Sequence, residues 1–136
     1  MQVSEVMHKG INTVQIGDSI KKVASLMKKE DIGAVPVFKN ERPVGFVTDR
    51  DIVISCIAEG RDSEDSISHA MRHQVFSIHE KDELTLASKI MRENQVSRLL
   101  VVDDGERPVG MISIQDIFQN AKDADLKTRL IDDIKR

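Results

Sequence analysis

The chain has 136 residues, with 23 acidic and 20 basic side chains and a formal net charge of −3. This balance creates no global positive field, which argues against nucleic acid and anionic membranes as partners. No apolar run is long enough to span a membrane, and the first residues lack a basic and apolar leader, so we expect a cytoplasmic protein. Cys56 is the only cysteine, which excludes an internal disulfide and favours a buried structural thiol.

Hydrophobic periodicity predicts a strand, helix, strand, strand, helix order in the first half of the chain. In chain order, we expect a short helical turn at 3–7, a strand at 13–14, a helix from Ile20 capped by Asp18 or Ser19, strands at 34–38 and 44–47, and a helix from Thr48. The apolar run at 34–38 suits a strand that is buried on both faces. The segment 60–66 that follows is polar and charged, as an exposed connection should be.

The second half of the chain repeats this order. A shift of 64 residues places Met7 on Met71, and after a one-residue insertion at 103–105 Gly45 falls on Gly110. The insertion lies between two apolar runs, so it lengthens a turn without changing the strand register. The matching elements are a turn at 67–71, a strand at 77–78, a helix from Leu84, strands at 99–102 and 109–112, and a helix from Ser113.

These boundaries predict a mixed α/β (α+β) protein built from two tandem domains. We expect domain 1 at 1–60, a linker at 61–66, domain 2 at 67–119 and a terminal amphipathic helix at 120–136. A unit this small cannot bury both faces of a three-stranded sheet. We therefore expect the two repeats to pack about a pseudo-twofold axis.

One motif recurs at the end of the last strand in each repeat: Gly45-x-x-Thr48-x-x-Asp51 and Gly110-x-x-Ser113-x-x-Asp116. A hydroxyl at the start of a helix can bind a phosphate, and an acid one turn later can accept hydrogen bonds from ribose hydroxyls. The glycine would let a ligand approach the strand backbone closely.

A purely structural explanation of this motif remains open. Ser/Thr-x-x-Asp before an apolar run closely matches a capping box, in which the hydroxyl and the acid satisfy backbone N–H groups of the helix. Two copies do not decide between a ligand site and a cap, because duplication copies either one.

Four runs of sequence resemble the CBS domain family: 31–37 and 45–52 in the first repeat, and 96–103 and 110–117 in the second. The likeness extends to about Gln119 and is closest to small free-standing pairs of CBS domains. It implies a non-catalytic regulatory module that binds adenine nucleotides of the AMP, ADP and ATP class in clefts between the two repeats. It also implies a homodimer and a regulated protein partner, with no required cofactor.

The resemblance also assigns ligand-binding residues in each repeat. In the first repeat they are Thr13, Ala34, Val35, Pro36, Thr48, Arg50 and Asp51, and in the second they are Ser77, Arg98, Leu99, Ser113 and Asp116. The two sets are not equivalent, since Asp49 and Arg50 follow the first hydroxyl whereas Ile114 and Gln115 follow the second.

Two other functions compete with this one. A ligand-independent interaction or dimerisation scaffold would use the same motifs as caps only. An enzyme is disfavoured, because the sequence offers no nucleophile paired with a base and no phosphate-binding Walker loop. His69 and His73 have a spacing that could place two metal ligands on a helix face, but solvated side chains explain them better than a metal site does.

Overall fold

The computed structural model describes residues 1–120 and divides the chain into two compact units. The first-repeat unit comprises Asn12–Val75, and the second-repeat unit comprises Met1–Ile11 together with the chain from Phe76 onward. The amphipathic helix expected at 120–136 lies outside the described residues except for Asn120. Within the described part of the chain, no helix has the length and apolar character needed to cross a membrane.

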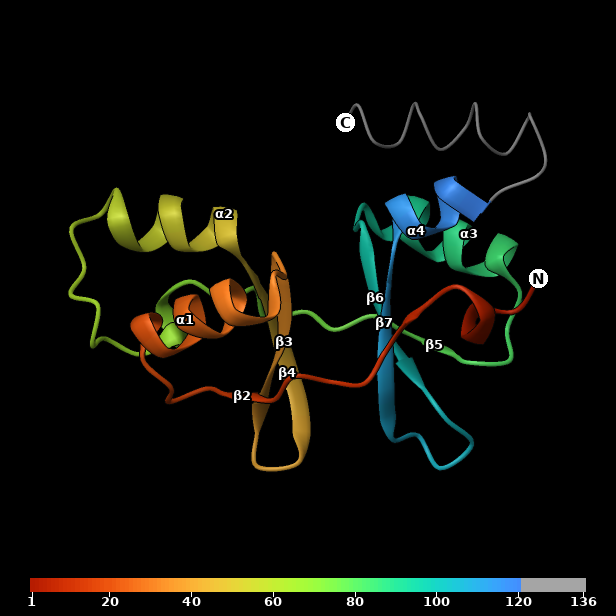
Figure 1. The fold of residues 1–136 in the computed structure, drawn as a ribbon, viewed down its shortest axis with the longest axis horizontal. Helices are drawn as coiled ribbons and strands as arrows, with labels where there is room; N and C mark the ends of the chain where they lie inside the picture. The colour runs from red at the N-terminus through yellow and green to blue at the C-terminus, as the bar shows by residue number, and fades with distance from the viewer. Residues whose placement is uncertain (121–136) are drawn as a thin grey trace. The chain divides into compact units, whose positions relative to one another are not determined.

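The first-repeat unit is a three-stranded sheet with helices beside it (Figure 1). The strand order is β2-β3-β4, with β2 parallel and β4 antiparallel to β3. Its elements are β2 (Val14–Gln15), α1 (Ile20–Glu30), β3 (Ala34–Lys39), β4 (Arg42–Thr48), α2 (Asp49–Ile52), the π-helix η2 (Val53–Ile57) and the 3-10 turn η3 (Ile67–His69).

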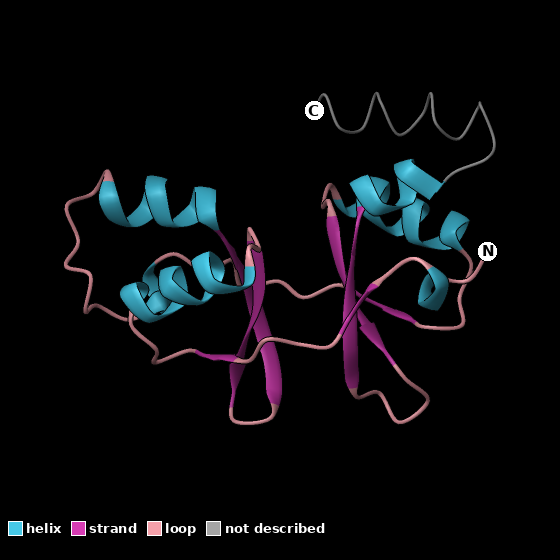
Figure 2. Ribbon diagram, viewed as in Figure 1, coloured by secondary structure: helices cyan, strands magenta, loops and turns pink. Residues whose placement is uncertain are grey.

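The second-repeat unit has the same order of elements along the chain and one strand more in its sheet (Figure 2). The strand order is β1-β7-β6-β5. Its elements are the 3-10 turn η1 (Val3–Glu5), β1 (His8–Lys9), β5 (Ser77–His79), α3 (Leu84–Asn94), β6 (Arg98–Val102), β7 (Pro108–Ser113) and α4 (Ile114–Asn120). The predicted order of strands and helices is confirmed in both repeats.

Local chemistry explains where α1 begins and ends. Ser19 is the N-cap, and its hydroxyl accepts a hydrogen bond from the backbone N–H of Lys22 at 3.0 Å. Along α1, Ile20, Val23 and Met27 recur at helical spacing and are all buried. The helix ends where Asp31 adopts a left-handed conformation with φ 53°.

Each unit has its own hydrophobic core between its sheet and its helices. Fully buried side chains on the central strands include Val35 and Val37 in the first unit, and Leu99 and Val101 in the second. Cys56 is buried in the first core, as predicted for a structural thiol, and this burial raises the pKa of its thiol.

The segment that leads into each repeat pairs with the sheet of the other repeat. Residues 3–9 begin the first repeat, yet β1 pairs antiparallel with β7, opposite Met111 and Gly110. Residues 67–72 begin the second repeat, yet Arg72 pairs with Phe46 on β4. We call 3–9 and 67–72 the leading segments. Because they are exchanged, the compact units are offset from the repeats in the sequence.

The exchange corrects the expectation for the two motif glycines. A Cβ atom on Gly45 would overlap the backbone carbonyl oxygen of Arg72, and one on Gly110 would overlap that of His8. The sequence suggested that these glycines let a ligand approach the strand. The structure shows that a leading segment of the chain itself needs the bare backbone there.

Candidate functional site

The hydroxyl–acid pair of the first repeat lies where β4 ends and α2 begins. Thr48 is the N-cap of α2, and its hydroxyl accepts from the backbone N–H of Asp51 at 3.1 Å. In return, the backbone N–H of Thr48 donates to Oδ2 of Asp51 at 2.9 Å. These reciprocal bonds form a complete capping box.

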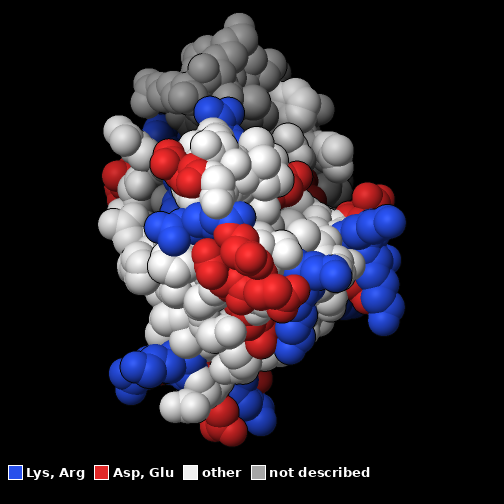
Figure 3. Space-filling model, turned by 90° about the vertical axis from the view of Figure 1, so that its left-hand side faces the viewer, with Lys and Arg blue, Asp and Glu red and all other residues white. Residues whose placement is uncertain are grey.

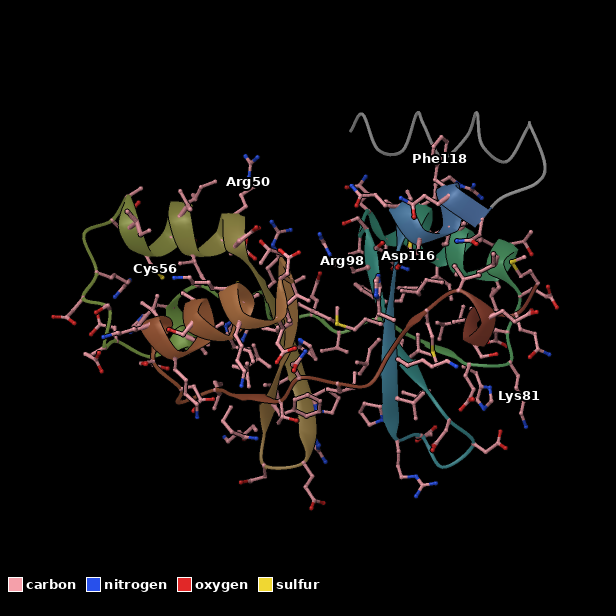
Figure 4. All side chains as sticks on the ribbon, viewed as in Figure 1. Arg50, Cys56, Lys81, Arg98, Asp116 and Phe118 are labelled. Carbon is pink, nitrogen blue, oxygen red and sulfur yellow. The ribbon has the colours of Figure 1, made fainter. Side chains whose placement is uncertain are left out.

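The second repeat builds the same arrangement between β7 and α4 (Figure 4). The backbone N–H of Asp116 donates to the hydroxyl of Ser113 at 3.1 Å, and the backbone N–H of Ser113 donates to Oδ2 of Asp116 at 2.9 Å. In both pairs the hydroxyl oxygen acts only as an acceptor in the cap. Its O–H group can still donate to an anion, and both Thr48 and Ser113 remain half-buried rather than enclosed.

The second carboxylate oxygen of each pair contacts a side chain from a leading segment. Nε of Arg72 donates to Oδ1 of Asp51 at 3.3 Å, and Nε2 of His8 lies 3.1 Å from Oδ1 of Asp116. Arg72 and His8 are not among the residues predicted from the sequence. The repeat does place these two residues at equivalent positions, each directly after a matched methionine, and that alignment was the available signal.

The structure places the predicted residues of each repeat within one unit. The pairing of β3 with β4 sets Ala34 opposite Thr48, and the pairing of β6 with β7 sets Arg98 opposite Ser113. Thr13 directly precedes β2 and Ser77 begins β5, and both side chains are exposed.

Three of the predicted residues contribute little accessible surface. Val35, Pro36 and Leu99 are buried within their sheets, so their side chains belong to the packed interior. Arg50 differs from them, because its side chain is exposed and reaches outward from α2 (Figure 4).

The residue after each hydroxyl differs between the repeats in charge and in burial. The exposed Asp49 carboxylate accepts from the backbone N–H of Arg50 at 2.8 Å, whereas the matching Ile114 is buried. The carboxylate of Asp49 lies over Gly33, where an added Cβ atom would come 3.2 Å from Oδ2. An acidic group therefore already occupies the start of α2.

The charged surface and the histidines bear on other kinds of site. On the face drawn in Figure 3, basic and acidic side chains lie next to one another, so that face carries no extended positive patch. His69 ends the short turn η3 and His73 lies beyond it, so the two do not share a helix face. Among residues 1–120, no group of three His, Cys, Asp or Glu side chains is placed to hold a metal ion.

The model of the CBS domain family matches the chain twice, at residues 3–56 and 66–123. The CBS domain-containing protein YhcV of Bacillus subtilis is 34% identical over 118 residues, which is 87% of this chain and 84% of that protein. Hypoxic response protein 1 of Mycobacterium tuberculosis is 30% identical over 118 residues, which is 85% of this chain and 82% of that protein. Two archaeal relatives are longer, and the chain covers 62% and 39% of their lengths.

Solved structures with the same fold contain adenosyl ligands. The CBS domain pair of the protein MJ0100, in complex with 5-methylthioadenosine and S-adenosyl-L-methionine, has a TM-score of 0.74 and 25% identity, covering 88% of this chain and 94% of that one. The CBS domain protein PAE2072 of Pyrobaculum aerophilum, complexed with AMP, has a TM-score of 0.77 and 21% identity, covering 97% and 99%. At this identity, the second likeness shows the fold alone.

Proposed function

Because the chain belongs to the CBS domain family, we propose that it is a non-catalytic regulatory module that binds an adenine nucleotide of the AMP, ADP or ATP class. The observation that carries this proposal is the paired hydroxyl and acid at the end of the last strand in each unit. Thr48 and Ser113 each keep an O–H donor for an oxygen of the ligand. We assign the acids three residues later, Asp51 and Asp116, to the ribose hydroxyls.

Each proposed site is completed by residues at the same end of its sheet. In the first-repeat unit, Thr13, Ala34 and Thr48 lie at the end where β2 and β3 begin and β4 ends. In the second-repeat unit, Arg98 and Ser113 occupy the matching places. The CBS domain pair of MJ0100, which holds methylthioadenosine and S-adenosylmethionine, supports an adenosyl ligand here.

Calorimetry and thermal unfolding with AMP, ADP, ATP and S-adenosylmethionine test the proposal. A ligand that binds only the folded state at 100 times its dissociation constant raises the stability by about 2.7 kcal/mol, so the unfolding temperature should increase. Asp51→Asn and Asp116→Asn keep the size and an acceptor oxygen but remove the charge, and each should weaken binding at its own site. Unchanged binding in both variants would reject the assignment of the ribose contacts.

A ligand-independent scaffold is the second candidate function. One observation favours it: both capping boxes are complete, and both acids already contact Arg72 or His8, so the motifs are satisfied without any ligand. An unfolding temperature that responds to none of the four ligands would favour this scaffold over a nucleotide sensor.

We also propose that the protein forms a homodimer through the outer face of η2. Val53, Ile54 and Ile57 lie on this short helix with 53%, 48% and 68% of their surface exposed. Adjacent exposed apolar side chains of this kind often mark an interface. Sedimentation analysis should find a dimer that Ile54→Glu and Ile57→Glu weaken, while Leu86→Glu, which alters an exposed apolar residue on α3, leaves it intact.

A further inference from the structure

The two proposed sites differ in the residue that faces the hydroxyl across the sheet. Ala34 is the partner of Thr48, whereas Arg98 is the partner of Ser113. Residues that are directly opposite in an antiparallel pair project on the same face, with their Cβ atoms about 5 Å apart. The second-repeat site therefore has an arginine opposite its hydroxyl, with a guanidinium that donates to the hydroxyl of the adjacent Ser97 at 3.3 Å. The first-repeat site has the methyl group of Ala34 in the same place.

The residue that follows the hydroxyl also differs in charge. It is an acid in the first-repeat site and an apolar residue in the second. Asp49 brings a carboxylate to the start of α2, and the absence of a side chain on Gly33 leaves room for it. In the second-repeat unit Ser97 stands in the place of Gly33, and Ile114 in the place of Asp49. The backbone N–H of Ile114 donates to the carbonyl of Ser97 at 2.8 Å. The first-repeat site thus gains a negative charge where the second has none.

We infer that the two sites select adenosyl ligands by charge: the Ser113 site takes a ligand that carries phosphate, and the Thr48 site takes one that does not. The inference rests on the proposed function, because it assumes that both sites bind an adenosyl group. It goes further by assigning the selection to Arg98 at one site and to Asp49 at the other.

The charges of the ligand and of these side chains explain the direction of the selection. A phosphate monoester carries a charge of −1.5 to −2 at neutral pH. Arg98 attracts this charge and can donate two parallel hydrogen bonds to it. Asp49 repels it, and the side chain of Arg50 extends away from α2 (Figure 4). At partly exposed sites, one such charge changes affinity by about tenfold.

The test compares AMP with adenosine, which share the adenosyl group and differ in the phosphate. Isothermal calorimetry on the full chain should show AMP binding that weakens about tenfold in Arg98→Gln and falls with added salt, while adenosine binding stays unchanged. Asp49→Asn should strengthen AMP binding at the Thr48 site by about tenfold and leave adenosine unaffected. The backbone amide signals of Thr48 and Ser113 in NMR spectra report which site each ligand occupies.

Matched variants at the other end of the strands control for a general change in charge. Lys39→Gln and Glu41→Gln alter exposed residues at the turn between β3 and β4, and neither should change the ratio of AMP to adenosine affinity. If both ligands bind but Arg98→Gln and Asp49→Asn leave that ratio unchanged, the charge selection is wrong and the proposed function stands. If neither ligand binds the protein or any variant, the charge selection is wrong, and the proposed function is wrong as well if ADP, ATP and S-adenosylmethionine also fail to bind.

Discussion

Replacing Gly45 by alanine should destabilise the protein by forcing the second leading segment away from β4. The new Cβ atom would overlap the carbonyl oxygen of Arg72 and come 2.7 Å from Cε of Met71. Two backbone hydrogen bonds hold the segment there. The N–H of Phe46 donates to the carbonyl oxygen of Arg72 at 3.0 Å, and the N–H of Arg72 donates to the carbonyl oxygen of Phe46 at 2.8 Å. Their loss costs about 2 kcal/mol, and partial exposure of the buried Met71 adds about 1 to 2 kcal/mol.

The expected loss of about 3 to 4 kcal/mol should lower the unfolding temperature by on the order of 10 °C. Urea unfolding followed by circular dichroism measures the free energy directly. Gly17→Ala is the matched control, because its Cβ atom would meet nothing within 4 Å, and it should be neutral or stabilise by about 0.4 to 1 kcal/mol. A Gly45→Ala protein as stable as the Gly17→Ala protein would refute the close approach of Arg72.

Four further predictions each concern a single side chain. Ser88 is 3% exposed and its hydroxyl has no hydrogen-bond partner among the described residues. Ser88→Ala should therefore raise the free energy of unfolding by about 1 kcal/mol. Ser19→Ala should lower it by about the same amount, because the α1 cap is lost. Hydrogen bonds from the backbone N–H of Arg107 above all, and then from Gly105, lower the pKa of Asp103. The charged form is therefore favoured by folding, and this stabilisation is full above about pH 4 and is lost as the pH falls further. The difference in urea midpoint between the wild type and Asp103→Asn should shrink on acidification, and a constant difference would contradict this. The raised pKa of Cys56 and its burial should make the thiol react with a thiol reagent only after unfolding, at the rate of global or local opening.

The repeated elements could be predicted from the sequence because their signals are local. Apolar periodicity identified α1 and α3, and the one-residue insertion at 103–105 fell in the turn between β6 and β7, where it leaves the strands unchanged. The hydroxyl–acid motif was located correctly in both repeats for the same reason, since a cap depends on residues three positions apart.

The repeat alignment sets Arg72 and His8 at equivalent positions, but it does not show which acids they contact, because the partners come from distant parts of the chain. Arg72 is 21 residues from Asp51, and His8 is 108 residues from Asp116. Neither residue stands out by composition, and its pairing depends on which sheet the leading segment joins. That choice is made by long-range packing and has no local pattern. The role of Gly45 was misread for the same reason.

The exchange of leading segments also affects how the protein forms during synthesis. Residues 67–72 leave the ribosome after β4, the strand with which they pair, has been synthesised. In contrast, β1 leaves the ribosome about a hundred residues before its partner strand β7. At typical translation rates, the first segment waits roughly 5 to 20 s for its partner strand. Throughout that time Val3, which is fully buried in the finished fold, is exposed to water. A fragment holding one repeat alone keeps a segment that fits a sheet it does not contain. A first-repeat fragment and a second-repeat fragment therefore have a ready route to exchange segments and associate.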